Sequence, residues 1–369
     1  MRFSRFKLEA AVVLAAALLA ACGGGGGGDS SGSSGSASSN SSGSSSTRSS
    51  STSVPSTNGS GSTSGVALLA PAATATSLPS ASGNATTDGI AWLNAVRQNV
   101  GLATLTNSAG LATASLDHAT YLVDNQTYGH SEVAGHTGYT GATPYDRIAA
   151  EGSYSMMGEV VVAGQPAAFN DSLSPVETLF DAPFHRIVML DDFTQMGVGS
   201  MTNANWEAFN IDFGSTGADT MSATTLVAYP YSGQQGVPAS WFANEDPNPF
   251  ASQPSYEMTT VGYPVTVQSA FGTTLSSLNF TITSASGANV SCLAQTPQTT
   301  PAELSNAAMC VPYSALASGT TYTVQVTGVL TDSSNQTYSI NVAWTFTTAA
   351  SGVAHSAVQS TQSRPLPKF

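Results

Sequence analysis

Apolar residues recur every three or four positions in the first patterned part of the chain, residues 87–152. This spacing predicts amphipathic helices, because residues three and four apart lie on one face of a helix. Asp88 is predicted to cap the first helix, in which Ile90, Leu93 and Val96 share a face, and Gly101 provides a natural end. Further helices are predicted to begin at Ser108, Thr143 and Ser174.

The pattern then changes to short apolar runs of the kind found in strands. These runs cover residues 156–163, 196–201, 206–213 and 224–229. Helices, a strand, a helix and more strands follow one another in this order. The fold class is therefore predicted to be α+β, with helices packed on a small antiparallel sheet, and we assign this domain to residues 87–229.

A second domain is predicted to contain only strands. Residues 230–257 are rich in Pro, Asn and Gln and read as a connector. Alternating apolar and polar residues then predict strands at residues 263–269, 278–284, 290–294, 320–329 and 337–347. This spacing is expected of a small β-sandwich, assigned to residues 258–349, and residues 350–369 are predicted to be a disordered tail.

Residues 1–21 have the features of an export signal. Positive residues precede an apolar stretch that is too short to span a membrane comfortably. The stretch closes with Leu19-Ala20-Ala21-Cys22, which resembles the lipobox of bacterial lipoproteins. The resemblance implies that Cys22 is lipidated and holds the protein on a membrane through acyl chains such as palmitate. An ordinary cleaved signal with an incidental Cys is the alternative.

Residues 22–86 are predicted to be a disordered tether, because Gly, Ser, Thr and Asn dominate and no apolar periodicity could offset the entropy of folding. Gly23 follows Cys22, where an Asp would, by the rule of lipoproteins, favour retention in the inner membrane. We therefore expect a lipid-anchored protein of the cell envelope, in the outer membrane of a Gram-negative bacterium, facing the periplasm or the cell surface.

The charge balance excludes one class of partner. With a net charge of −13 and 8% charged residues, the chain has no basic face that could replace counterions on nucleic acid. Between Ser49 and Ser363 it has only three cationic side chains, Arg97, Arg147 and Arg186. We expect them to be structural anchors that pair with carboxylates or bond carbonyls.

Cysteine usage agrees with export. If Cys22 carries lipid, Cys292 and Cys310 remain as an even pair in a compartment where disulfides persist. We predict that they bond to each other. A reactive or metal-binding pair is the weaker alternative, because neither has a neighbouring His or a Cys-x-x-Cys partner.

Residues 94–214 carry a resemblance to a known family. Its landmarks occur in family order: Asn94-x-x-Arg97, Gly101-Leu102 with Leu105, Gly129-His130-Ser131, Pro144-Tyr145-Asp146-Arg147, Gly152, Gly158-Glu159, Pro183-x-His185-Arg186 and Met196-Gly197-Val198-Gly199. The segment resembles the CAP superfamily (cysteine-rich secretory proteins, antigen 5, pathogenesis-related 1) and its bacterial SCP branch. The resemblance implies an α-β-α sandwich with a central cleft.

The family also implies candidate site residues. Its cleft is lined by two His and by acidic residues, which map by position to His130, His185 and Glu159. A second acid is expected before the second His, where Asp181 is the better candidate and Glu177 has the alternative role of capping the helix that begins at Ser174. Val160 departs from the family motif, which usually has Asn there, so we expect a less polar cleft.

His130, His185 and Glu159 are also a chemically reasonable divalent metal site, with zinc as the candidate ion. The sequence itself requires no cofactor, and hydrogen bonding at the junction of sheet and helix is the alternative role for both imidazoles. His118 lies on the apolar stripe of its helix and is expected to be a satisfied core residue.

The strands near residues 320–348 resemble the closing strands of bacterial Ig-like domains, which are usually spacers or adhesive surfaces. Two functions follow from these resemblances. The first is a membrane-anchored binding module that recognises an apolar, lipid-like ligand, an envelope polymer or a partner protein through the cleft. The alternative is a metal-assisted hydrolase in which Glu159 activates a water molecule.

Overall fold

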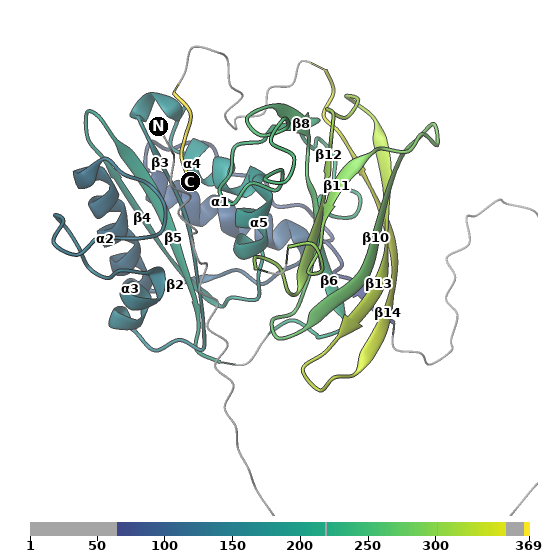
Figure 1. Cartoon of the computed structure of the whole chain (residues 1–369), viewed down its shortest axis with the longest axis horizontal. Coiled ribbons are helices and arrows are strands. Elements are labelled where there is room, and N and C mark those ends of the chain that lie inside the picture. Colours follow the sequence, from purple (N-terminus) through teal and green to yellow (C-terminus); the bar gives the residue numbers. More distant parts are fainter. Residues whose placement is uncertain (1–64, 218–219, 301, 352–364) are drawn as a thin grey trace, which may run out of the picture. The chain divides into compact units, whose positions relative to one another are not determined.

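The computed structural model describes residues 65–217, 220–300, 302–351 and 365–369 (Figure 1). The predicted signal peptide, Cys22 and the tether as far as residue 64 lie outside the described residues. Among the residues that are described, no helix combines the length and the apolar composition needed to cross a membrane.

The helices all belong to the first half of the described chain. They are α1 (Ala85–Val100), α2 (Ala109–Asn125), α3 (Pro144–Glu151), α4 (Ser174–Asp181) and α5 (Pro183–Met189), with a 3-10 turn at Pro166–Ala168. Two helix starts follow the sequence prediction: Ser108 caps α2, and Thr143 forms a capping box with Asp146 at α3.

Two other helix starts differ from the prediction. Asn84, rather than the predicted Asp88, caps α1 and accepts a hydrogen bond from the N–H of Thr87. At α4 no side chain caps the helix, because the hydroxyl of Ser174 accepts from the N–H groups of Asn170 and Asp171 in the preceding loop. The capping box expected of Ser174 and Glu177 is therefore wrong.

One sheet organises the helical region. It consists of β2 (Thr106–Asn107), β4 (Gln195–Thr202), β5 (Glu207–Ser215) and β3 (Met156–Gly164), in that order. Figure 1 shows α2 and α3 on one face of this sheet and α1, α4 and α5 on the other. The α+β prediction, with helices on both faces of a central sheet, is confirmed. β3 pairs only with β5 within this sheet and is an edge strand.

Close packing of α2 on β4 explains the glycines of the Met196-Gly197-Val198-Gly199 motif. A Cβ atom added to Gly197 would lie 2.0 Å from the backbone nitrogen of Ala112, and one added to Gly199 would lie 2.3 Å from that of Leu116. Real Cβ atoms do not approach so closely. The two glycines therefore let the backbone of the helix lie directly on the strand.

The remaining strands belong mainly to the sheet-rich second half. One sheet has the order β1 (Ala67–Leu68), β6 (Thr225–Tyr229), β9 (Val265–Ser269), β12 (Ala307–Pro312) and β11 (Cys292–Gln295). A second sheet has the order β10 (Thr274–Ser284), β13 (Thr321–Thr331) and β14 (Thr337–Thr347), and β7 (Ser240–Phe242) pairs with β8 (Thr260–Gly262). The expected all-β region is confirmed, although β12 was not predicted.

The structure corrects four of the predicted segment assignments. In the expected tether, β1 pairs with β6 because Val66 is buried and Ala67 bonds the main chain at Thr224. β6, assigned to the helical domain, pairs with β9 of the second half. The expected connector contains β7.

The fourth of these corrections concerns the expected disordered tail, of which residues 352–364 lie outside the described part. In residues 365–369, Lys368 forms a bridge with Ala163 on β3, and the side chain of Phe369 is buried. An apolar contact available only in the folded chain orders this segment.

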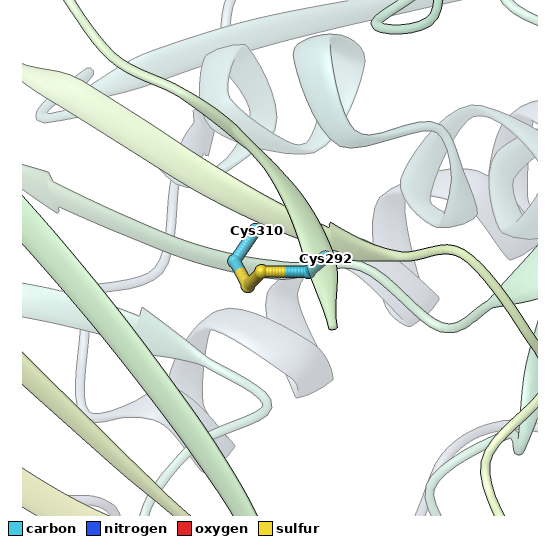
Figure 2. The surroundings of a disulfide bond; sticks show 2 residues. All are labelled: Cys292 and Cys310. Atoms are coloured by element: carbon cyan, nitrogen blue, oxygen red, sulfur yellow. A yellow bond between two sulfur atoms is a disulfide. The ribbon is translucent and has the colours of Figure 1, made fainter. Parts of the chain in front are cut away.

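The predicted disulfide between Cys292 and Cys310 is confirmed (Figure 2). It links β11 to β12, two antiparallel neighbours in which Ala294 lies opposite Cys310. Closing this loop constrains the unfolded chain, and the expected stabilisation is about 3 kcal/mol.

Candidate functional site

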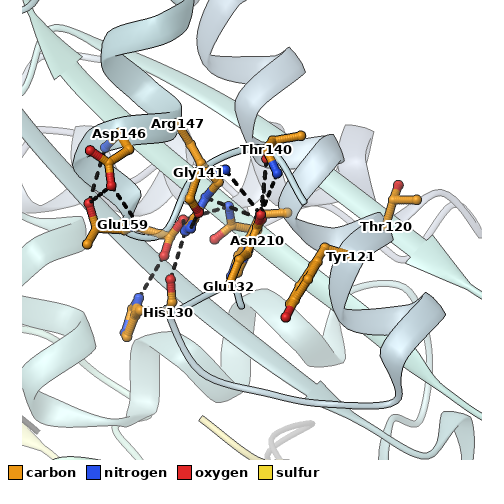
Figure 3. A network of polar contacts seen from close by, with 12 residues as sticks. Thr120, Tyr121, His130, Glu132, Thr140, Gly141, Asp146, Arg147, Glu159 and Asn210 are labelled. Carbon is orange, nitrogen blue, oxygen red and sulfur yellow. Dashed lines mark hydrogen bonds and ion pairs between the residues drawn. The ribbon is translucent and has the colours of Figure 1, made fainter. Parts of the chain in front are cut away.

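His130 and Glu159 form the first half of the site (Figure 3). His130 lies in the loop after α2, and Glu159 lies on β3. The imidazole Nδ1 of His130 is 2.8 Å from Oε1 of Glu159. The Glu159 side chain is 1% exposed, whereas the His130 side chain is 36% exposed. The carboxylate is therefore a buried support that orients an accessible imidazole.

The second oxygen of Glu159 is occupied by other side chains. Oε2 accepts a hydrogen bond of 2.7 Å from the guanidinium of Arg147 on α3 and one of 3.2 Å from the amide of Asn210 on β5. Arg147 also donates to the carbonyl oxygens of His130 and Gly141. It therefore fixes both the carboxylate and the loop that carries the histidine.

These contacts decide the charge of the carboxyl groups. Burial by itself would raise the pKa of Glu159, but the positive charges of His118 and Arg147 and the hydrogen bond from His130 outweigh it and lower this pKa. Asp212 lies opposite Glu159 on β5. Burial and the negative charge of Glu159 raise the pKa of Asp212 well above its usual value. The pair is therefore one buried carboxylate beside one buried carboxylic acid.

A second hydrogen-bond network, around His118 and Glu132, holds the loop between α2 and α3. His118 on α2 places Nδ1 2.9 Å from Oε1 of Glu132 and Nε2 3.0 Å from the carbonyl oxygen of Gly129. Both ring nitrogens of His118 therefore have hydrogen-bonding partners. Glu132 also accepts hydrogen bonds from the N–H groups of Thr140 and Gly141, as Figure 3 shows. His118 is the satisfied core residue that its place on the helix predicts.

His185 and Glu245 form the other half of the site. His185 is in the first turn of α5, and Glu245 follows β7, in the segment assigned to the connector. Oε1 of Glu245 lies 2.8 Å from Nδ1 of His185 and accepts hydrogen bonds from the main-chain N–H groups of Phe184 and His185. Burial raises the pKa of Glu245, although these hydrogen bonds and the charge of His185 oppose the shift.

The two imidazoles face each other. The ring centroids of His130 and His185 lie 6.4 Å apart, with their planes inclined by 19°. In both residues Nδ1 contacts a buried carboxylate, so the Nε2 side is left for other contacts. Nε2 of His185 is buried and has no hydrogen-bond partner among the described residues. We call His130, His185, Glu159 and Glu245 the two-histidine site.

Asp181, the acid expected beside His185, contacts a different group. Its Oδ1 accepts a hydrogen bond of 2.6 Å from the hydroxyl of Tyr263, which lies between β8 and β9. The acid that contacts His185 is Glu245 instead.

Arg186 and Arg97 bond main-chain carbonyls. Arg186 donates to the carbonyl oxygens of Phe180, Asp181 and Pro264, and its guanidinium lies over the rings of Tyr229 and Tyr263. Arg97 donates to the carbonyl oxygens of Ala103, Met189, Asp191 and Phe193. Burial lowers the pKa of Arg97 to about 10. Both side chains are placed as the anchors that the sequence analysis expects.

The proposed zinc ligands are only partly suited to a metal. The two imidazoles have the orientation that carboxylates give to metal-ligating histidines. Glu159, the third candidate, already accepts hydrogen bonds from three side chains. In the ranges that the structure describes, no group of three or more His, Cys, Asp or Glu side chains could hold a metal ion.

Phe369, which lies far beyond the helical domain in sequence, packs on His185 of the site. Its ring centroid lies 5.0 Å from that of His185, and the residue is only 6% exposed. The neighbouring Lys368 pairs with Ala163 through hydrogen bonds of 2.7 and 2.8 Å between their main chains. Residues 365–369, which we call the docked segment, therefore lie along β3 and end on His185.

Sequence reasoning missed the acids and the amide that contact the candidate residues: Glu132, Asn210, Asp212 and Glu245. A signal existed for two of them, because Asn210 and Asp212 are polar residues two positions apart in an otherwise apolar strand and share one face. No local signal marks Glu245, whose contact with His185 depends on the tertiary fold.

Comparisons with known proteins agree with this architecture. The model of the Cysteine-rich secretory protein family (CAP) matches residues 90–213, and the model of the Bacterial Ig-like domain matches residues 252–348. The comparison with curated proteins finds no relative.

Two solved structures are among those similar to parts of this chain. One is an extracellular protein containing a SCP domain from Bacillus anthracis str. Ames, with 19% identity, a TM-score of 0.30 and coverage of 36% of this chain and 40% of that one. The other is CopC from Methylosinus trichosporium OB3b, with 16% identity, a TM-score of 0.22 and coverage of 35% of this chain and 94% of that one. With its two family matches, the chain carries a CAP domain of the cysteine-rich secretory protein family followed by a bacterial Ig-like domain.

Proposed function

We propose that this protein is a binding module of the cell envelope and that its two-histidine site receives the ligand. The observation that carries the proposal is the fixed pair of imidazoles, 6.4 Å apart, each with Nδ1 against a buried carboxylate. Such support fixes each ring in one orientation before a ligand arrives, which lowers the entropic cost of binding.

The surroundings favour a ligand with an apolar group. His185 is covered by the aromatic ring of Phe369, and Phe184 beside it is also buried. The site therefore accommodates an uncharged aromatic side chain, that of Phe369, against the ring of His185. A lipid-like molecule, an envelope polymer or a protein segment remains the expected class of ligand.

Hydrolysis has less support. A general base works best when its pKa lies near the working pH, and the contacts of Glu159 lower its pKa instead. Both of its oxygens also accept hydrogen bonds from protein side chains. Glu159 is therefore better suited to orient His130 than to activate water.

Attachment to the envelope is part of the proposal. It rests on the sequence Leu19-Ala20-Ala21-Cys22, and the disulfide between Cys292 and Cys310 supports an oxidising compartment outside the cytoplasm. Cell fractionation tests this part. The parent should sediment with membranes and Cys22→Ser should not, and equal distribution of both would contradict the anchor.

Calorimetric titration of the full chain tests ligand binding. The panel consists of fatty acids, phospholipid micelles, peptidoglycan fragments and short peptides, each in EDTA. We expect at least one class to bind the parent and His136→Ala, an exposed histidine that is the matched control, and to lose binding in His185→Ala. Binding that His185→Ala leaves unchanged, or no binding by any class, would overturn the proposed site.

Metal binding is a second candidate, favoured by the carboxylate behind each imidazole and by the unpartnered Nε2 of His185. A bound ion would supply Lewis acidity at this position. Zinc titration of the full chain and of the His130→Ala/His185→Ala double variant tests it. A stoichiometry near one that disappears in the double variant would support a metal site, and no heat of binding would reject it.

A further inference from the structure

The docked segment adds to the edge of the CAP sheet as a short strand would. Main-chain N–H and carbonyl groups of Lys368 and Ala163 bond each other in both directions. Among the strands that the structure describes, β3 pairs with β5 alone, so its other edge has main-chain groups available to an extended peptide. Main-chain pairing of this kind recognises an extended backbone whatever its sequence.

Side chains add selectivity to this pairing. The ring of Phe369 packs on His185, and the ammonium of Lys368 lies 4.8 Å from the ring centroid of Tyr128. The amide of Asn244 donates a hydrogen bond of 2.9 Å to the carbonyl oxygen of Pro367. The site thus contacts an aromatic side chain, the cationic side chain before it and the main chain of the residue before that.

The same contacts indicate that the docked segment can be displaced. Only one residue pair joins it to β3, and Pro365 and Pro367 lack the N–H groups that would extend the pairing. Lys368 is exposed, and Pro365 and Leu366 are half-buried. The ring of Phe369 packs on that of His185, whose Nε2 is buried without a hydrogen-bond partner among the described residues, and this unpaired group weakens the contact.

We propose that the two-histidine site binds an extended peptide segment of another protein, with an aromatic anchor on His185 and its backbone along the edge of β3. The docked segment of this chain is the competing occupant, so an incoming peptide must displace it. The inference rests on the proposed function, because it names the ligand class of the same site.

Fluorescence polarisation tests this directly. The probe is a fluorescein-labelled, C-terminally amidated peptide with the sequence of residues 365–369, and the proteins are the full chain and the chain with residues 365–369 deleted. An intramolecular competitor acts at about millimolar effective concentration. We therefore expect saturable binding to the deleted chain and binding about ten-fold weaker or more to the full chain.

Two controls fix the meaning of a positive result. A probe with Phe369→Ala should bind at least about ten-fold more weakly, because one buried aromatic anchor commonly dominates such an interface. A probe with the same residues in scrambled order should bind as weakly as the probe with Phe369→Ala. Equal binding by all three probes, or equal binding by both proteins, would overturn the proposal.

A second variant keeps the proposal testable if the deletion does not fold. The full chain with Phe369→Ala should bind the unmodified probe more tightly than the parent, with an unchanged circular dichroism spectrum. No binding to either folded variant overturns peptide recognition, and the proposed function still survives if another panel class binds in a His185-dependent way. A parent dimer that Phe369→Ala converts to a monomer would assign the site to a second copy and also overturn the proposal.

Discussion

The carboxylate of Glu245 contacts the imidazole of His185 across 60 residues of sequence, with 2.8 Å between Oε1 and Nδ1. One oxygen of Glu245 also accepts the main-chain N–H groups of Phe184 and His185 at the start of α5. A single residue between the two family domains therefore fixes both the ring and the helix that carries it.

Glu245→Ala should lower the free energy of unfolding by about 3 kcal/mol. The change leaves buried donors without an acceptor, and each such donor costs about 1–3 kcal/mol. Glu245→Gln, which retains a carbonyl oxygen, should cost less. Urea denaturation followed by circular dichroism measures both, with the exposed Glu303→Ala as control. A loss no greater than that of the control would contradict the role assigned to Glu245.

Arg147→Met should destabilise the protein by about 3–5 kcal/mol, because it leaves the carboxylate of Glu159 buried without its cationic partner. The double variant Arg147→Met/Glu159→Gln should recover part of this loss, since the uncompensated charge is then absent. Chemical denaturation of the parent, the two single variants Arg147→Met and Glu159→Gln, and the double variant gives the coupling between the two residues. Additive effects would show that the pair is not coupled.

Asp212→Asn should change how stability depends on pH. The pKa of Asp212 is raised in the folded state, so below the usual Asp pKa of 3.8 both folded and unfolded chains hold the proton and this group contributes nothing. As the pH rises above that value, the unfolded chain releases the proton while the folded chain retains it, and stability falls.

Asp212→Asn removes this decline. Thermal denaturation should show a higher Tm for the variant than for the parent at pH 7 and nearly equal values close to pH 3.5. Asp124→Asn, at an exposed position of α2, controls for the substitution itself. A parent that exceeds the Asp212→Asn variant in Tm at pH 7 would show that the buried group is ionised in the folded protein.

Gly197→Ala should destabilise the CAP domain by about 1–3 kcal/mol or more, the usual cost of overpacking, because its Cβ would lie 2.0 Å from the backbone of α2. Gly217→Ala is the matched control, since none of the described residues other than its chain neighbours lies within 4 Å of its added Cβ. Denaturant midpoints of the two variants make the comparison. Similar midpoints would mean that α2 does not lie against β4 as described.

The parts of this fold that the sequence predicts are those governed by local rules. The periodicity of α1 and α2 and the helix starts at Ser108 and Thr143 depend on residues within a few positions of each other. The order of the short motifs likewise placed His130, His185 and Glu159, two of which form a direct contact.

The remaining features depend on long-range packing. Asp181 precedes His185 by four positions, a spacing that places two residues on one face of a continuous helix. Its carboxylate contacts Tyr263 instead, because α4 ends at Asp181 and Pro183 begins a new helix. The pairing of β6 with β9 and the contact of Phe369 with His185 also join distant segments. No local pattern encodes these choices.

The most direct test of this account is a nuclear Overhauser measurement between Phe369 and His185 in the full chain, with Phe and His selectively labelled. The ring centroids lie 5.0 Å apart, so cross-peaks between their ring protons are predicted. An excess of the unlabelled peptide of residues 365–369 should displace the labelled Phe369 from His185 and remove these cross-peaks. Phe369 resonances at random-coil positions without such cross-peaks would contradict an aromatic anchor at the two-histidine site.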